Sequence, residues 1–277
     1  MSTPSKSKYR FLLIPTGSRR HSDAPKEQRV MNYAGVKHLL DDVEWDLHKG
    51  GPGSAWVLNR ESYLHAAAGL LPIVREACES GNYNALVILG GGDPGVSESR
   101  EIARKYGVAV TGCGCAQMHV ACTLGNRFSV LDFPEAHNMY YADLVARYRY
   151  AERCASIRNI DVPNPPPGAD AKSWLYVEKE MALRGEPAPV VERAIKEAVT
   201  AIEEDGAEVI IMGCSGTFWL KPFVEKGLRE IGWEVPVLEG YECAISVARL
   251  LVDLGVNASG LAFPADRPLK WRRKKFV

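Results

Sequence analysis

The sequence lacks two features that decide many protein classes at once: a net charge and a long apolar run. Its 277 residues carry 34 Lys and Arg against 34 Asp and Glu, so no overall field attracts nucleic acid or an anionic membrane. No run reaches the roughly eighteen apolar residues of a membrane span, and the first ten residues, MSTPSKSKYR, lack a signal-peptide core. The basic tail KWRRKKFV is typical of a solvated terminus. We expect a soluble, cytoplasmic protein with no nucleic-acid or membrane partner.

Cysteine pairs at metal-binding spacing are also absent. The seven cysteines are an odd number and favour reduced thiols over a disulfide framework. Cys113 and Cys115 stand one residue apart in VTGCGCAQMH, but a structural zinc site needs about four ligands and no second pair follows. We therefore expect no metal, with Cys115 either packing or acting as a functional thiol. The remaining helical or apolar cysteines are assigned to packing: Cys78, Cys122, Cys154 and Cys243.

Short apolar runs alternate with helical patterns along the whole chain. Strands are expected in YRFLLIP, VEWDLH, NALVILG, VAVTG, RFSVLDF, AEVIIMG and VPVLEG. Helices are expected over 25–40, around 66–78, in SESREIARKYG, and over 139–150, 190–202 and 242–254, with a rigid loop at VPNPPPGAD. This alternation predicts an α/β fold with mostly parallel sheets flanked by helices.

Two segments resemble each other, which indicates two related lobes. ALVILGGGDPG (residues 85–95) and AEVIIMGCSGT (residues 207–217) are each an apolar strand that runs into a Gly-rich turn. Ligands collect at the carboxyl ends of parallel strands, so we expect both turns to face one cleft. The expected division is residues 1–122 plus 243–277 for the first lobe and 123–242 for the second.

Four segments in a fixed order carry a resemblance to a known family. They are GGGDPG, TGCGCAQMHVACTLGNRFSVLD, IIMGCSGT and VPVLEGYECAISVARLL, spread between Ile14 and Pro268. In this order they are similar to the aspartate/glutamate/hydantoin racemase superfamily, especially its hydantoin and allantoin racemase branch. The resemblance implies two pseudo-symmetric α/β lobes with the site between them, and no pyridoxal phosphate or metal. It also implies chemistry by two thiols, one from each lobe.

Racemisation beside a carbonyl needs a base on one face of the carbon and an acid on the other. A thiol has a pKa of about 8.5, which falls near a helix N-terminus and makes the sulfur a usable base. Cys214 follows the strand VIIMG and precedes SGTF, which can begin a helix. We therefore expect a catalytic Cys214 whose pKa is lowered by backbone N–H groups.

The first lobe departs from the two-thiol pattern. Counting back from Asp93 puts the family's first cysteine at Gly90, whereas the internal match between the lobes puts it at Gly91. A glycine cannot transfer a proton, although Gly90, Gly91 and Gly92 offer backbone donors for a carboxylate or an oxyanion. The turn could also be a tight turn without a ligand. Cys115 is the candidate for a relocated second thiol, and His119 is expected to be buried and hydrogen-bonded.

Further contacts with the substrate are expected from both lobes. Where the family has an Asn-Thr pair, this chain has PTGS, in which Thr16 and Ser18 could donate hydrogen bonds. Asp132 stands where the family usually has threonine, and it either faces the cleft or caps a loop. After Cys214, the expected substrate-binding residues are Ser215, Gly216 and Thr217.

The resulting hypothesis is a cofactor-independent, cysteine-dependent racemase or isomerase. It would act beside a carbonyl of a small polar substrate, such as a cyclic ureide, an amino acid or a carboxylate, and we expect a homo-oligomer. Two alternatives stay open. One is a one-thiol decarboxylase or double-bond isomerase of the same superfamily, and the other is a non-catalytic sensor of a small molecule.

Overall fold

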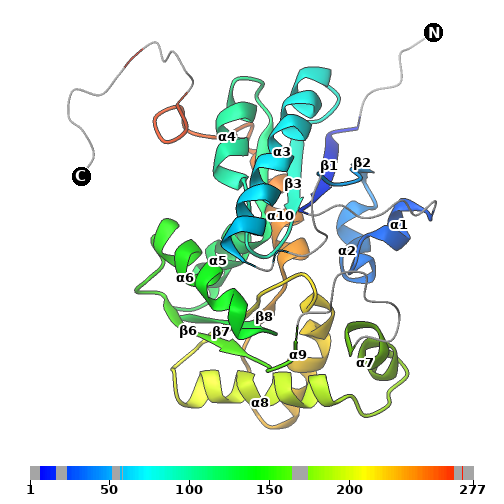
Figure 1. Cartoon of the computed structure of the whole chain (residues 1–277), viewed down its shortest axis with the longest axis vertical. Coiled ribbons are helices and arrows are strands. Elements are labelled where there is room, and N and C mark those ends of the chain that lie inside the picture. Colours follow the sequence, from blue (N-terminus) through cyan, green and yellow to red (C-terminus); the bar gives the residue numbers. More distant parts are fainter. Residues whose placement is uncertain are drawn as a thin grey trace.

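The computed structural model describes residues 7–16, 24–51, 57, 59–163, 174–264 and 270. Figure 1 shows two layered halves, with the first sheet and its helices in blue and cyan and the second in green and yellow. Within the described residues, no helix is long and apolar enough to cross a membrane.

Each half contains a four-stranded parallel sheet with the same strand order. The first sheet is ordered β2 (Val43–Leu47), β1 (Tyr9–Pro15), β3 (Ala85–Leu89) and β4 (Ala109–Gly112). The second is ordered β6 (Cys154–Asn159), β5 (Phe128–Asp132), β7 (Val209–Met212) and β8 (Val237–Leu238). The predicted α/β fold of two lobes with parallel sheets is confirmed.

Helices cover both faces of each sheet, as the strands' apolar residues on both faces require. They are α1 (Lys26–Arg29), α2 (Tyr33–Leu40), α3 (Arg60–Ser80), α4 (Val96–Arg104), α5 (Cys113–Leu124), α6 (Asn138–Arg147), α7 (Trp174–Leu183), α8 (Pro189–Glu203), α9 (Lys221–Glu230) and α10 (Gly240–Asp253), with 3₁₀ turns η1 (Glu135–His137) and η2 (Phe218–Leu220). On one face of the first sheet, Leu86 and Ile88 pack against Leu70 and Val74 of α3. On one face of the second, Val130 and Ile211 pack in a cluster with side chains of α5 and α6.

Several elements differ from the sequence expectation. The helix expected over 25–40 is two helices, because the backbone of Val30 is extended and its side chain is buried. β6 and α7 were not expected, and α9 begins later than the helix expected at SGTF. β6 is half-buried along its whole length and lacks the apolar run that marks the other long strands. Only the first residues of the predicted loop VPNPPPGAD, residues 162–163, lie within the described part of the chain.

The chain returns to the first lobe at its C-terminal end. α10 contacts β3, β4, α2 and α5, and Figure 1 shows it beside the first sheet in orange. Its first residue fits tightly, since a Cβ on Gly240 would lie 2.4 Å from the Phe218 ring and 2.5 Å from the Cys113 Cβ. This packing accords with a first lobe of residues 1–122 plus 243–277 and a second of 123–242, and these boundaries stay a prediction.

In each parallel sheet, the order in which strands are added changes direction between the two central strands, β1 and β3 in the first sheet and β5 and β7 in the second. β1 and β3 are neighbours and pair Pro15 with Leu89, while β5 and β7 pair Leu131 with Met212. In open parallel sheets, a ligand site lies where the connections leave neighbouring strands in opposite directions. The residues at or just beyond these strand ends are therefore the ones to inspect: Thr16, Gly90, Asp132 and Gly213.

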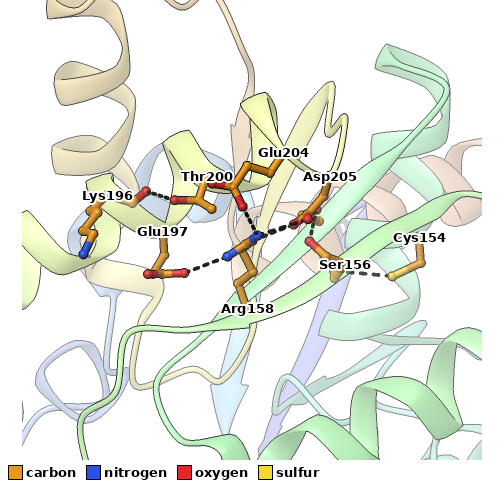
Figure 2. Close-up of polar contacts among 9 residues, drawn as sticks. Cys154, Ser156, Arg158, Lys196, Glu197, Thr200, Glu204 and Asp205 are labelled. Atoms are coloured by element: carbon orange, nitrogen blue, oxygen red, sulfur yellow. Dashed lines mark hydrogen bonds and ion pairs between the residues drawn. The ribbon is translucent and has the colours of Figure 1, made fainter.

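An ion-pair network fastens the edge strand β6 to α8 (Figure 2). The guanidinium of Arg158 donates two hydrogen bonds to Asp205, at 2.5 and 3.0 Å, and one to Glu197 at 3.2 Å. Glu204 approaches the same guanidinium at 3.7 Å. The hydrogen bond from Arg158 is the main reason why the pKa of Asp205 is lowered. A charged side chain on an edge strand also discourages pairing with another sheet.

Replacing Arg158 should destabilise the protein in a pH-dependent way. Arg158→Ala removes a bidentate pair and leaves neighbouring carboxylates unpaired, so urea unfolding at pH 7 should show a loss of about 1–2 kcal/mol. Because the folded pKa of Asp205 is lowered, the pair's stabilisation is present above the unfolded pKa of about 3.9 and is lost as the pH falls below it. The difference between wild type and variant should therefore shrink in acid.

The matched control is Arg229→Ala. Among the described residues, the ion pair found for Arg229 is with Glu225 on the same exposed helix face, at 3.5 Å, so its removal should change the unfolding free energy little. Equal losses for the two variants, or a loss for Arg158→Ala that does not depend on pH, would contradict the structural role of the network.

Candidate active site

Cys214 lies in a tight turn beyond the end of β7. Gly213 donates its N–H to Leu131 O at 2.8 Å, and Thr217 closes the turn by donating its N–H and hydroxyl to Cys214 O at 2.8 and 2.7 Å. The expected helix at SGTF starts later, with η2 and then α9 at Lys221. Thr217 is fully buried, and its hydroxyl stabilises the turn; its role in substrate binding stays a prediction.

Hydrogen-bond donors surround the half-buried Cys214 sulfur, as the sequence suggested. The N–H groups of Ser215 and Gly216 and the hydroxyl of Ser215 point to it and favour its anionic form. Burial and the charge of Asp132 outweigh them, and together they raise the pKa of Cys214 to about 12. The expected lowering of this pKa was therefore wrong, and the thiol is protonated in the free protein at neutral pH.

Asp132 is the fully buried carboxylate beside this turn. Its Oδ1 accepts the N–H of Phe133 at 2.8 Å and the N–H of Cys214 at 3.0 Å. Its Oδ2 lies 2.9 Å from His137 Nδ1. Of the two roles left open by the sequence, the structure shows the cap: Asp132 holds the Cys214 turn with its side chain.

His137 belongs to the site but was missed by the sequence reasoning. It is almost fully buried in η1, and its Nε2 lies 3.2 Å from the carbonyl oxygen of Val57. A carbonyl only accepts, so Nε2 carries the hydrogen of this contact. The His137 ring thus bridges Asp132 and the Val57 carbonyl oxygen. The only signal in the sequence was a histidine in the loop after β5.

The glycine turn beyond β3 meets the Cys214 turn directly. A Cβ on Gly91 would lie 1.9 Å from the carbonyl oxygen of Gly213 and 2.8 Å from the hydroxyl of Tyr141. A Cβ on Gly90 would lie 2.4 Å from Thr16 Cγ2, whereas on Gly92 it would meet only the Tyr63 ring, at 3.5 Å. Glycine at 90 and 91 thus lets neighbouring groups come close, and neither position has space for a cysteine side chain in this geometry.

The expected backbone donors of this turn are partly used by the protein itself. The N–H of Gly90 points to Ile88 O and to the Cys113 sulfur. Thr16, half-buried beside Gly90, remains placed to contact a ligand at the end of β1. Ser18, expected to bind substrate with it, lies outside the described residues.

Cys113 and Cys115 do not join Cys214. Cys113 is fully buried in the core, and its sulfur donates to Ile88 O at 3.4 Å. The Cys115 sulfur faces the first lobe, where it accepts from the Arg100 guanidinium at 3.2 Å and donates to Gly112 O at 3.4 Å. Burial raises the pKa of Cys115 to about 12. None of the interactions found for Cys115 in the described part of the chain includes Cys214, so the structure gives the relocated second thiol no support.

Asp93, in the turn beyond β3, has a structural role. Its side chain is fully buried and accepts the N–H groups of Gly114 at 2.8 Å and Cys115 at 2.6 Å, which caps α5. It also accepts the Tyr148 hydroxyl, from the second lobe, at 3.0 Å. His119 on α5 is exposed, contrary to expectation, with Nδ1 3.5 Å from the Tyr150 hydroxyl. Over the residues that the structure describes, no three His, Cys, Asp or Glu side chains form a metal-binding group.

Comparison with known proteins identifies the family. Residues 38–248 match the family model described as "Asp/Glu/Hydantoin racemase". The chain belongs to this family. It is 31% identical over 216 residues to a hydantoin racemase of Pseudomonas sp. (strain NS671), covering 77% of this chain and 75% of the relative. A hydantoin racemase of Rhizobium meliloti is 30% identical over 191 residues, covering 69% of each.

Solved structures with this fold include racemases and a decarboxylase. Allantoin racemase from Klebsiella pneumoniae aligns with a TM-score of 0.70 at 24% identity, over 95% of this chain and 97% of its own. A Gly-to-Cys, Cys-to-Ser double mutant of arylmalonate decarboxylase aligns with a TM-score of 0.56 at 16% identity, over 88% and 92%. The predicted membership of the racemase superfamily is confirmed, and the chain is an enzyme of racemase or isomerase type. The replacement of a first catalytic cysteine by glycine stays a prediction.

Because the two turns touch, alanine substitutions at Gly91 and Gly92 should lower the unfolding free energy by different amounts. Gly91→Ala forces a methyl group into a backbone carbonyl of the other lobe and should lower the unfolding free energy by about 1–3 kcal/mol in urea. Gly92→Ala adds the same methyl group at an ordinary contact distance and serves as the control, with a small change. Equal effects at the two positions would mean that the turns do not touch in solution.

Removing the charge of Asp132 should lower the pKa of Cys214. Asp132→Asn keeps an oxygen for the N–H groups of Phe133 and Cys214 but loses the negative charge, which is the second cause of the raised pKa. The ultraviolet absorbance of the thiolate, measured against Cys214→Ser in each background, should titrate at lower pH in the variant. A titration at unchanged or higher pH would contradict the electrostatic account of the site.

Proposed function

We propose that this chain is a cofactor-independent racemase that uses the Cys214 thiol as an acid and base at a carbon beside a carbonyl. The observation that carries the proposal is the setting of this sulfur. It is half-buried beyond β7, receives hydrogen bonds from the Ser215–Gly216 backbone, and lies where the turn of one lobe meets the glycine turn of the other. Such a group can take a proton from a ligand held between strand ends.

The substrate class that we propose is a cyclic ureide. The sequence relatives are named hydantoin racemases, and two similar structures are allantoin racemases, from Klebsiella pneumoniae and Pseudomonas fluorescens. Hydantoin and allantoin share a five-membered ureide ring with a hydrogen beside a carbonyl. Neutral groups such as the hydroxyl of Thr16 and the ring of Tyr63 lie against the glycine turn, which suits an uncharged polar ring better than a dicarboxylate.

In the proposed reaction, the Cys214 thiolate removes the hydrogen beside the carbonyl. The electron pair of the C–H bond moves onto the carbonyl oxygen, and a proton returned to the opposite face gives the other enantiomer. Because burial raises the pKa of Cys214, the thiol must first lose its proton. The Asp132–His137 pair supports this step by fixing the turn, since Asp132 accepts the Cys214 N–H and also contacts His137.

Exchange in heavy water tests the proposal. Wild-type protein incubated with one enantiomer of 5-benzylhydantoin, or with allantoin, should incorporate solvent deuterium at the stereocentre and lose optical rotation, after subtraction of the uncatalysed rate. Cys214→Ser should lower both rates by at least about 100-fold, the lower end of general acid–base contributions. Cys154→Ser, a half-buried thiol on the edge strand β6, should leave them unchanged.

Other outcomes of these experiments would contradict the proposed racemase function. Release of carbon dioxide from a substituted malonate with deuterium on one face would indicate a one-thiol decarboxylase. Exchange that persists in Cys214→Ser would remove the thiol from the mechanism. No exchange with hydantoins, allantoin, amino acids or malonates would favour a small-molecule sensor.

A further inference from the structure

The proposed racemisation needs a second proton-transfer group, and the first-lobe turn supplies none of its own. Gly90, Gly91 and Gly92 have no side chains, and Cys115 faces Arg100. Any group on the first-lobe side of a substrate must therefore reach this turn from another element. The identity of this second proton-transfer group is an inference that rests on the proposed function.

Within the described part of the chain, the hydroxyl groups of Thr16, Tyr63 and Tyr141 lie near the glycine turn. Thr16 lies against Gly90, but an aliphatic hydroxyl is a much weaker acid than a phenol. The Tyr63 hydroxyl already donates to Gly92 O at 2.9 Å. The Tyr141 hydroxyl lies 2.8 Å from the point where a Gly91 Cβ would stand, and no hydrogen bond of this hydroxyl is found among the described residues. Of these three hydroxyls, it is the phenol whose proton is not already donated to another group in the described part of the chain.

The position of the Tyr141 hydroxyl matches that of the Cys214 side chain in the other lobe. Gly91 is the second residue after β3, and Cys214 is the second residue after β7. The hydroxyl thus occupies the direction that a side chain at the equivalent first-lobe position would take. The carbonyl oxygen of Gly213, the residue before Cys214, lies 1.9 Å from the same Gly91 Cβ position. Tyr141 and the Cys214 turn are therefore close neighbours.

The environment keeps the phenol protonated. Tyr141 is 3% exposed, on α6 of the second lobe. Burial is the first cause that raises its pKa, and the charges of Asp132, Cys214, Asp93 and Cys113 raise it further. The phenol therefore keeps its proton in the free protein, and this is the proton that a carbanion beside it would take.

We propose that Tyr141 is the second catalytic residue, which delivers a proton to the substrate carbon on the face opposite Cys214. The C–H bond breaks as the Cys214 thiolate takes the proton, and the electron pair rests on the substrate carbonyl oxygen as an enolate. The Tyr141 O–H bond then breaks, a new C–H bond forms, and a phenolate is left. Water reprotonates the phenolate and accepts the thiol proton, so no oxidant or reductant is needed.

Tyr141→Phe separates inversion from exchange. In heavy water with one enantiomer of 5-benzylhydantoin, the variant should still exchange the hydrogen with retention, because Cys214 can return deuterium to the face it deprotonates. Inversion should fall by at least about 100-fold. Tyr140→Phe is the matched control on the same helix. Its hydroxyl is buried without a partner among the described residues, and its ring stacks on Tyr63 at 5.5 Å. This control should invert within about twofold of wild type.

Two results would overturn the role of Tyr141: inversion in Tyr141→Phe close to that of wild type, or equal loss of exchange and inversion in a folded variant. If circular dichroism shows that Tyr141→Phe does not fold, the test uses the wild-type chain with its tyrosines replaced by 3-fluorotyrosine. The hydroxyl of 3-fluorotyrosine is a stronger acid than that of tyrosine. The pH profile of inversion should move to lower pH while that of exchange with retention stays, and an unmoved profile overturns the proposal. Absence of both reactions in wild type would instead refute the racemase function, and with it this role.

Discussion

The close approach of Gly91 to the carbonyl oxygen of Gly213 is the constraint on which the site depends. Two parallel sheets with the same strand order present their carboxyl ends to each other, and the turns beyond β3 and β7 touch backbone to backbone. Such contact is possible only where one side lacks a Cβ. It places Cys214, the residue after Gly213, at the boundary between the lobes, where a ligand would contact both.

The buried carboxylates of Asp132 and Asp93 stabilise the boundary between the lobes by hydrogen bonds. Asp132 caps the turn that carries Cys214, and Asp93 caps α5 while accepting the hydroxyl of Tyr148 from the other lobe. Each carboxylate is fully buried, and its hydrogen bonds offset the cost of removing it from water. The same burial and charge keep Cys214 protonated at rest.

The sequence was a good guide to the fold because its core strands are short apolar runs that end in glycine or proline. It failed for β6, whose half-buried residues have no apolar run, and for the helix break at Val30, which tertiary packing decides. Within the candidate site, the strand–turn pattern placed Cys214 in a turn beyond β7, as the structure has it. The roles of Asp132 and Thr217 depended on which backbone groups lie near them after folding. His137 and Tyr141 come from η1 and α6, beyond any local motif, so only the assembled structure brings them to the turns.

The most direct test of this account is a crystal structure with a 5-substituted hydantoin bound to the Asp132→Asn or wild-type protein. The account predicts that the ring lies between the Gly90–Gly92 and Cys214–Thr217 turns. The carbon that bears the substituent should lie about 3–3.5 Å from the Cys214 sulfur, the separation of reacting atoms in a productive complex. A ring bound elsewhere, or one whose carbonyl carbons alone approach the sulfur, would contradict the proposal that Cys214 is an acid and base for proton transfer.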